Sequence, residues 1–173
     1  MDKEKSEKQS VLFDFQAPHS RGRWRIINDV VMGGVSGSEV LITEPGTLLF
    51  TGNLSLEQGG GFASARTEAP ALPLQKFSGF NLRVRGDGKR YQLRLRTEQE
   101  GQEITYRAHF DTHPDTWMEI QIPFQAFQPM FRGQVLEDAP ALKPETIRQL
   151  GMLIAEKQAG EFRLEMDWLK AYA

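Results

Sequence analysis

Apolar and polar residues alternate with a period of two over most of this chain, and this alternation limits the fold more than any other feature. The clearest runs cover residues 80–85, 91–96, 104–110, 117–122 and 162–168. Because successive side chains of a strand point to opposite faces, each run predicts a strand with one apolar and one polar face. Strands of this kind are typical of antiparallel sheets with one face in solvent. The chain is therefore predicted to be all-β.

Turn signals separate the predicted strands. Residues 86–89, Gly-Asp-Gly-Lys, contain the Asp-Gly pair of a tight hairpin turn. Residues 44–46, Glu-Pro-Gly, separate the apolar runs 38–42 and 47–51, which we expect to form another hairpin. Strands that recur about every 10–15 residues with turns between them favour a β-sandwich, in particular a jelly roll.

Helix signals are confined to one short stretch. Residues 143–150 can form one short helical turn with Pro144 near its start, and residues 150–155 then form another strand. The 173 residues contain no internal repeat and no linker, which indicates one domain. We expect residues 1–10, which carry charges of mixed sign, to be a solvated tail, and residues 11–173 to form a single β-sandwich domain.

The composition excludes several classes of function. The chain has no cysteine, which excludes disulfides, thiol catalysis and thiolate zinc sites. Its 21 basic and 23 acidic residues give a net charge of −2, which argues against nucleic-acid binding. No segment approaches the roughly 18 apolar residues of a membrane-spanning helix, and the mixed-charge N-terminus is unlike a signal or transit peptide. We therefore expect a cytoplasmic protein that does not insert into membranes.

The known motifs of catalysis and cofactor binding are missing from the sequence. The glycine-rich residues 31–37 lack the Lys-Ser/Thr of a P-loop and the glycine spacing of a dinucleotide-binding turn. His109 and His113 have the spacing of a helical metal site, but Pro114 and the surrounding strand pattern remove that geometry. No Gly-x-Ser-x-Gly elbow is present, and no pair among the 23 acidic residues stands out as glycosidase carboxylates. We expect a non-enzyme without cofactor or metal.

The glycine-rich loop at residues 30–38 is the first candidate site. Two roles are open for it: a backbone turn that needs positive φ angles, or a loop that faces a ligand or partner. Asn28 and Asp29 precede the loop, where they can cap the turn through backbone amides or supply oxygens to a hard cation such as calcium. The capping role is favoured. The candidate contacts of this loop are Asn28, Asp29, Gly33 and Gly34.

A cationic sheet face is the second candidate site. If the strands around 80–110 pair as consecutive hairpins, six basic residues share one face: Arg83, Arg85, Arg94, Arg96, Arg107 and His109. Trp117 joins them if its strand lies in the same sheet. Several guanidiniums on one face can bind carboxylates, phosphates or an acidic protein surface, and a ring among them can stack on a sugar or pack at an interface. The alternative is a solvated face neutralised by Glu98, Glu103 and Glu119.

A series of short motifs runs in order through nearly the whole chain. It comprises Trp24 to Ser36, Gly59 to Ser64, Gly79-Phe80, Gly86 to Tyr91, Tyr106 to Phe110, Trp117 with Ile122 to Phe124, and Phe131 to Gly133. This series, which spans roughly residues 11–170, resembles the complex I intermediate-associated protein 30 (CIA30) family. The resemblance implies a galactose-binding-like jelly-roll β-sandwich, the fold class that the strand pattern also favours.

The resemblance also implies a role. Eukaryotic members of the family assist the assembly of mitochondrial NADH:ubiquinone oxidoreductase (complex I) as chaperone-like factors, and related chloroplast domains bind RNA or assist photosystem biogenesis. No catalytic residues are implied. Because the chain has no transit peptide and no long N-terminal extension, it looks like a stand-alone bacterial-type member.

The leading hypothesis is a non-catalytic assembly or interaction protein. Its partner would be a protein, such as a respiratory complex subunit or assembly intermediate, bound through the loop at residues 28–38 and the cationic face. The alternative is a module that binds carbohydrate or another small ligand. Few aromatic residues are expected to be exposed for a sugar, since Trp24 and Trp168 are predicted to pack in the core. RNA binding is disfavoured because no RNP-like aromatic motif is present.

Overall fold

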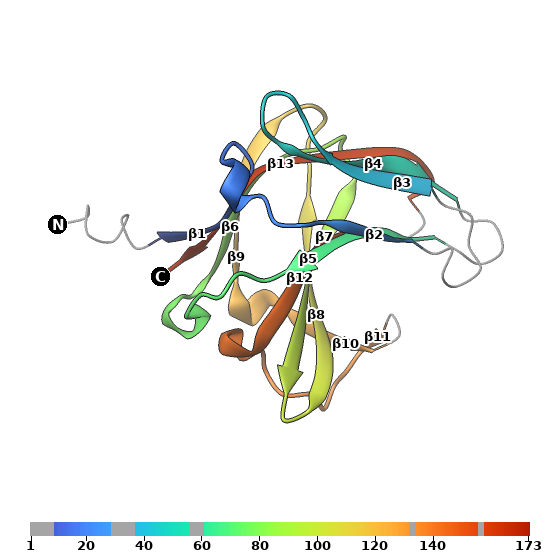
Figure 1. Cartoon of the computed structure of the whole chain (residues 1–173). Helices are drawn as coiled ribbons and strands as arrows, with labels where there is room; N and C mark the ends of the chain where they lie inside the picture. The colour runs from blue at the N-terminus through green and yellow to red at the C-terminus, as the bar shows by residue number, and fades with distance from the viewer. Residues whose placement is uncertain (1–8, 29–36, 56–60, 132–133, 156–157) are drawn as a thin grey trace.

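Two antiparallel sheets packed face to face make up the protein (Figure 1). The computed structural model describes residues 9–28, 37–55, 61–131, 134–155 and 158–173. Sheet A consists, in spatial order, of β3 (Gly37–Ile42), β4 (Leu48–Leu54), β13 (Gly160–Tyr172), β6 (Gly79–Arg85) and β9 (Trp117–Pro123), with β1 (Gln9–Asp14) paired to β13. Sheet B consists of β11 (Gln134–Val135), β10 (Gln128–Phe131), β8 (Gln102–Asp111), β7 (Arg90–Gln99), β12 (Ile147–Ile154), β5 (Ala63–Glu68) and β2 (Arg25–Asn28).

Helical structure in the described residues is limited to four short 3-10 turns. They are η1 (Pro18–Ser20), η4 (Leu74–Lys76), η5 (Phe124–Ala126) and η6 (Pro144–Thr146). The last lies inside the stretch predicted to make one helical turn, and the predicted strand follows it, although β12 begins at Ile147 rather than at residue 150. The described part of the chain contains no helix that is long and apolar enough to cross a membrane.

The core lies between the two sheets and is built from the apolar faces of the alternating strands. Tyr91, Leu93 and Leu95 of β7 are at most 1% exposed, while Phe50 and Phe162 approach from sheet A with their ring centroids 4.9 Å apart. Burial of side chains of this size supplies most of the stability of a domain, and truncation of one to alanine typically costs about 2–5 kcal/mol. The predicted period of two therefore places these residues correctly.

Two hairpins form as the sequence predicts and one does not. β3 pairs with β4 through a turn in which Gly46 has a φ of 94°, and β7 pairs with β8. The hairpin predicted at residues 86–89 is wrong, because β6 belongs to sheet A and β7 to sheet B. Asp87 fixes this crossing: its carboxylate accepts hydrogen bonds from the backbone N–H of Arg163 in β13 and from the Tyr91 hydroxyl.

The two tryptophans predicted to lie in the core differ. Trp24 packs against the core, with its ring centroid 5.5 Å from that of Phe13. Trp168 instead lies partly buried on the outer face of sheet A, with the Lys170 ammonium 4.1 Å above its ring. The register of β13 against β6 shifts between Met166 and Trp168, so the alternation changes phase there and Leu169 takes the core position. The prediction for Trp168 is therefore wrong.

The N-terminal boundary also differs slightly from the prediction. β1 begins at Gln9 and pairs with the end of β13, so the ordered domain starts before residue 11. The remaining part of the predicted tail, residues 1–8, lies outside the described residues. Pairing of the first and last strands brings both ends of the described chain to one side of sheet A (Figure 1).

Candidate functional site

The six basic residues predicted to share one face lie on two different sheets. Arg83 and Arg85 belong to β6 of sheet A, whereas the other four belong to β7 and β8 of sheet B: Arg94, Arg96, Arg107 and His109. The prediction of a single face is therefore wrong, because the chain crosses from one sheet to the other after β6. Since both groups point away from the core, they occupy opposite sides of the sandwich.

On sheet A, Trp117 joins Arg83 and Arg85, as predicted for a strand in the same sheet. β9 pairs with β6, and the two guanidinium carbons lie 4.9 and 5.0 Å from the centroid of the Trp117 ring. Carboxylates neutralise both arginines. Arg85 donates a 2.7 Å hydrogen bond to Glu165, and Arg83 lies 3.3 Å from Asp167. This group is a network whose charges are already paired.

The buried carboxylate of Glu165 is the centre of that network. Its side chain is 6% exposed and accepts hydrogen bonds from Arg85, Arg163 and Thr47. Burial alone would raise the pKa of Glu165, but these hydrogen bonds outweigh it and lower that pKa. The bond to Glu165 is in turn the main reason why the pKa of Arg85 is raised. Both groups therefore stay charged and bind each other.

On sheet B, one row across the strands holds four arginines. β2, β5, β12, β7 and β8 place the following residues directly opposite one another in turn: Arg25, Arg66, Gly151, Arg94 and Arg107. Neighbouring strands lie about 4.8 Å apart, so the row concentrates positive charge in the middle of the sheet. Like charges directly opposite each other destabilise a sheet. We refer to these five residues as the arginine row.

The members of the arginine row differ in their partners. Arg25 lies 3.6 Å from Glu68, and both side chains are more than half exposed. Arg94 donates a 2.8 Å hydrogen bond to the side chain of Gln92. Arg66 and Arg107 make no ion pair or hydrogen bond with any residue that the structure describes, and the Nε of Arg107 is buried. Two cations of the row thus make no direct ion pair within the described part of the chain, although Glu103 and Glu68 lie near enough to Arg66 to act on its charge.

A small cavity of about 170 Å³ opens over the middle of the arginine row. Its charged lining consists of Arg66, Arg94 and Arg96, the last of which also bonds Glu103 at 2.9 Å. Gly151 is part of the lining, and a Cβ there would come within 2.7 Å of the Ala65 carbonyl oxygen, so β12 can lie this close to β5 only with glycine at this position. Burial and then the charges of Arg96 and Arg25 lower the pKa of Arg66, and Glu103 and Glu68 offset this only in part.

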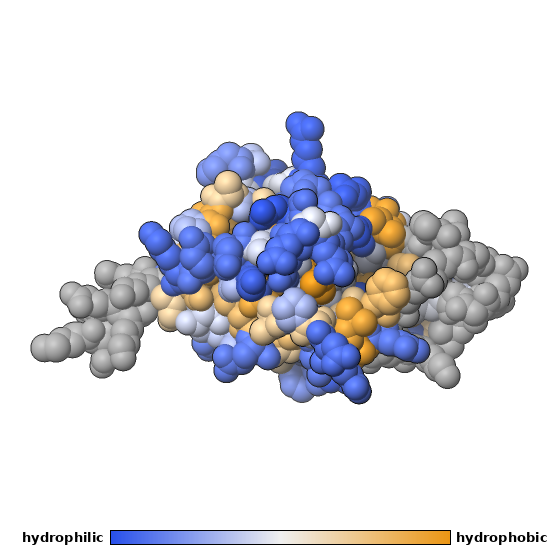
Figure 2. Space-filling view, turned by 90° about the horizontal axis from the view of Figure 1, so that it is seen from below, coloured by the Kyte–Doolittle hydropathy of each residue, from blue (hydrophilic) through white to orange (hydrophobic). Residues whose placement is uncertain are grey.

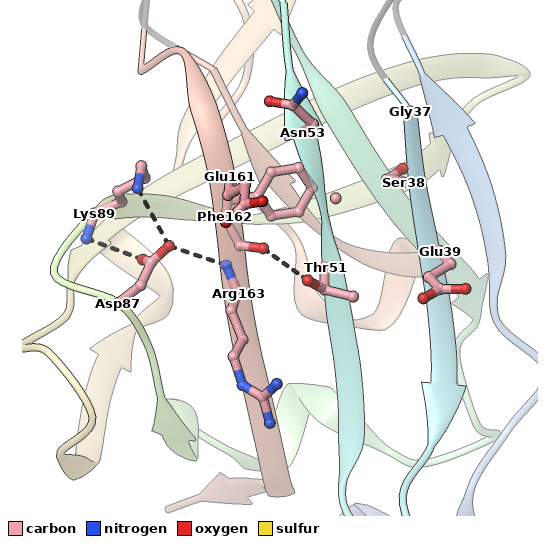
Figure 3. A pocket seen from close by; sticks show the side chains of 11 residues that line it. Gly37, Ser38, Glu39, Thr51, Asn53, Asp87, Lys89, Glu161, Phe162 and Arg163 are labelled. Carbon is pink, nitrogen blue, oxygen red and sulfur yellow. Dashed lines mark hydrogen bonds and ion pairs between the residues drawn. The ribbon is translucent and has the colours of Figure 1, made fainter.

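A larger groove of about 810 Å³ lies on the other side of the molecule, along β3, β4 and β13 (Figure 3). Its polar groups are mostly engaged already. Asp87 holds the backbone of Arg163 and the ammonium of Lys89, and Thr51 donates to the carbonyl of Phe162 (Figure 3). Among the described residues of its lining the only aromatic one is Phe162, which is 2% exposed and offers no open ring face. The smaller cavity on sheet B is therefore the better candidate site.

The surface seen from below Figure 1 is mostly hydrophilic, with smaller hydrophobic groups between the polar ones (Figure 2). In Figure 1 this is the side on which β8, β10 and β12 lie, below the strands of sheet A. Large exposed hydrophobic residues among those described are few, and Phe131 and Val135 at the end of sheet B are two of them. Recognition on this side must therefore depend mainly on polar and charged groups.

Of the predicted loop contacts, Asn28 lies within the described residues. Asn28 is the last residue of β2 and lies opposite Ala63 of β5. Asp29, Gly33 and Gly34 lie outside the described residues, so their capping or contact roles stay predictions. His109 of β8 lies opposite Gln92 and two residues along the strand from Arg107.

The sequence reasoning missed two residues of the arginine row, Arg25 and Arg66. The alternation around them gives a signal, because Ala63 and Ala65 are fully buried and Arg66 must face outward. What joins Arg66 to Arg94 is the pairing of both β5 and β7 with β12, which links strands far apart in the sequence. No turn motif in the sequence indicates that β12 pairs with both β5 and β7.

Comparison with known proteins identifies relatives by sequence. Residues 13–166 match the family described as Complex I intermediate-associated protein 30 (CIA30). A Drosophila melanogaster protein, "Complex I intermediate-associated protein 30, mitochondrial", is 25% identical over 92% of this chain and 61% of its own length. The mouse protein of the same name is 26% identical over 96% of this chain and 57% of its own length. The chain therefore spans about three fifths of the length of these relatives.

Solved structures show the same fold. The family 11 carbohydrate-binding module of the Clostridium thermocellum cellulase Lic26A-Cel5E superimposes with a TM-score of 0.71 over 95% of this chain and 94% of that one, at 14% identity. The same family module has been solved in complex with a β-1,3-1,4-mixed-linked tetrasaccharide, also at a TM-score of 0.71 and 14% identity over 95% of each chain. At this identity the likeness shows the fold alone, and it confirms the predicted jelly-roll β-sandwich.

Proposed function

Because this chain belongs to the complex I intermediate-associated protein 30 (CIA30) family, we propose that it is a non-catalytic binding protein that assists the assembly of a respiratory complex. It does so by holding an acidic segment of a protein partner on the outer face of sheet B. The names of the Drosophila and mouse relatives state an association with intermediates of complex I. One structural observation supports the site: Arg66 and Arg107 of the arginine row make no ion pair or hydrogen bond with any described residue.

The chemistry of the row suits carboxylates. A guanidinium offers a planar fork of donors that binds a carboxylate through two parallel hydrogen bonds, and such charge-assisted bonds are roughly twice as strong as neutral ones. In the chain without a partner, Arg66 and Arg107 contribute repulsion instead of bonds. A partner that brings carboxylates removes this repulsion and gains the bonds. An acidic segment therefore binds where the sheet is electrostatically least favourable on its own.

The overall charge of the chain does not oppose this site. The net charge is −2, but the positive groups of sheet B are separated from the acidic network of Glu165 and Asp167 on sheet A by the whole core. Local potential, rather than net charge, steers an acidic partner toward one face. The protein would thus orient its partner on sheet B.

Carbohydrate binding is the competing proposal, because a relative in fold has been solved with a bound tetrasaccharide. Sugar rings usually bind by stacking on exposed aromatic side chains as well as by hydrogen bonds. None of the described residues that line the cavity over Gly151 is aromatic, and its volume of about 170 Å³ is small for an oligosaccharide. Anion recognition therefore suits the arginine row better than sugar recognition does.

Native co-purification tests the proposed function. The tagged protein is isolated from its own host in mild detergent, and bound proteins are identified by mass spectrometry. The wild type should enrich subunits of a respiratory complex, and the double variant Arg66→Glu/Arg107→Glu should lose them. Lys76→Glu/Lys143→Glu is the matched control, because it changes the net charge equally at two exposed lysines outside both sheets.

Each result of this experiment decides one part of the proposal. Respiratory subunits retained by the control and lost by the arginine variant support both the role and the site. Equal recovery of respiratory subunits with the wild type and both variants would show that the partner binds outside the arginine row. Absence of respiratory subunits from the wild-type preparation would contradict the assembly role itself.

A further inference from the structure

The cavity over Gly151 has the size of a single functional group. Its volume of about 170 Å³ equals that of roughly five or six water molecules, and pockets for drug-sized ligands start at about 300 Å³. A sugar chain or a nucleotide does not fit inside it. One carboxylate or phosphate group fits together with a few waters.

The lining of the cavity selects the charge of that group. Arg66, Arg94 and Arg96 surround it, and Thr105 adds a hydroxyl beside them. Arg107 follows Arg94 in the row, and its buried Nε has no partner among the described residues. Arg107 itself is not among the described lining residues, so the guanidiniums at the cavity are those of Arg66, Arg94 and Arg96, which favour an oxygen that carries negative charge. The cavity is therefore chemically an oxyanion site.

The surroundings of the cavity indicate how long the ligand is. The arginine row continues past the cavity on both sides, with Arg25 at one end and Arg107 at the other. Leu153, which is 9% exposed, supplies an apolar wall at the cavity itself. A free anion uses only the centre of this arrangement. A polypeptide with several carboxylates uses the whole row and packs its aliphatic carbons against the wall.

We propose that the cavity over Gly151 is an oxyanion subsite that anchors one carboxylate of the partner's acidic segment, with Arg66 and Arg94 as its principal donors. This inference rests on the proposed function, because the carboxylate belongs to the assembly partner. Gly151 is the positioning residue, since it keeps the centre of the row open and allows β12 to lie close to β5. The other arginines of the row extend the contact along the segment.

Small anions test the subsite without the partner. Inorganic phosphate and acetate are titrated separately into the purified protein, and the N–H signals of the arginine Nε atoms are followed by NMR. Both anions should shift the signals of Arg66 and Arg94. Arg66→Gln should weaken phosphate binding about tenfold, because one charge-assisted hydrogen bond is lost. Arg25→Gln is the matched control, since Arg25 lies in the same row but outside the cavity lining, and it should change the affinity less than about twofold.

Arg66→Gln in the co-purification experiment distinguishes the source of the anion, and Lys76→Gln is its control because Lys76 is exposed and lies outside both sheets. Loss of the partner with Arg66→Gln, and its retention with Lys76→Gln, supports a carboxylate of the partner in the cavity. Phosphate binding to the pure protein together with full retention of the partner by Arg66→Gln would overturn the anchoring role and identify a site for a free anion. Titrations that leave the Arg66 and Arg94 signals unchanged would overturn the subsite, whether or not respiratory subunits are captured.

Discussion

Arg85 of β6 donates a 2.7 Å hydrogen bond to Glu165 of β13, whose carboxylate is almost completely buried. This pair marks the contrast between the two sides of the sandwich. On sheet A each arginine beside Trp117 has a carboxylate within 3.3 Å. On sheet B the arginine row keeps Arg66 and Arg107 without one among the described residues. The arginines of sheet A therefore contribute to stability, whereas those of sheet B are the ones that we propose to bind a partner.

Removal of Arg85 should destabilise the protein. Arg85→Gln leaves the buried Glu165 without its shortest hydrogen bond, although Arg163 and Thr47 remain as donors, and the expected loss of unfolding free energy is about 2 kcal/mol. Urea denaturation measures it. The matched control is Arg90→Gln, whose pair with Asp111 is 3.5 Å long and at least half exposed, and it should cost less than about 0.5 kcal/mol. Equal losses for the two variants would show that Glu165 does not depend on Arg85.

Removal of Arg66 should not destabilise the free protein and should stabilise it slightly. Burial lowers the pKa of Arg66 most, and the charges of Arg96 and of Arg25, which faces Arg66 across the β2–β5 pair, lower it further. Arg66→Gln removes that repulsion, and we expect the free energy of unfolding to rise by about 0.5 kcal/mol. The same denaturation experiment measures it. A loss of more than about 1 kcal/mol would indicate that Arg66 has a structural partner and is not reserved for a ligand.

The lowered pKa of Glu165 predicts a particular pH dependence. Because the folded-state pKa lies below the unfolded value of about 4.3, the ionised carboxylate stabilises the fold above that value. This stabilisation is lost as the pH falls from about 4.3 through the folded-state pKa. Wild type should therefore lose more unfolding free energy between about pH 5 and pH 3 than Glu165→Gln, which lacks the titrating group. Parallel curves for the two proteins would contradict the assignment.

The shift in strand register in β13 predicts losses of stability of different size for two neighbouring residues. Trp168→Ala removes a partly exposed ring whose main described contact is Lys170, so it should cost less than about 1 kcal/mol. Leu169→Ala creates a cavity at a position that is 1% exposed, and it should cost about 2–4 kcal/mol. Urea denaturation of both variants tests the register. A larger loss of unfolding free energy for Trp168→Ala than for Leu169→Ala would contradict the register shift and support the uninterrupted alternation that the sequence predicts.

These residues show how much of the fold could be predicted from the sequence. The period of two identifies the inward side chains of β7, such as Tyr91 and Leu93, because burial on one face leaves a local pattern. It fails at Trp168, since one extra residue in a strand changes the phase without any glycine or proline to signal it. It also fails at Asp87, because an Asp-Gly turn has the same composition whether the chain folds back or crosses to the other sheet.

The candidate site was predictable only in part for a similar reason. The outward direction of Arg94 and Arg107 follows from alternation, and their β7–β8 hairpin is local in sequence. The contribution of Arg66 depends on β12, a strand more than 80 residues later in the chain, which pairs with both β5 and β7. Such long-range register is set by the packing of the whole sandwich. A single sequence considered alone carries no local signal of that long-range register.

Salt should weaken partner binding in a way that separates the arginines of the row. Exposed charges are screened over about 8 Å at physiological ionic strength, while desolvated ones are screened much less. Arg25 is about half exposed, so Arg25→Gln should slow association at low salt, and this difference from wild type should fade above about 300 mM NaCl. Arg66 and Arg107 line or adjoin the cavity, so Arg66→Gln should raise the dissociation rate at every salt concentration. Surface-based kinetics with the captured partner measure both rates. If high salt removed the effect of Arg66→Gln as completely as that of Arg25→Gln, the cavity would not enclose the partner's carboxylate.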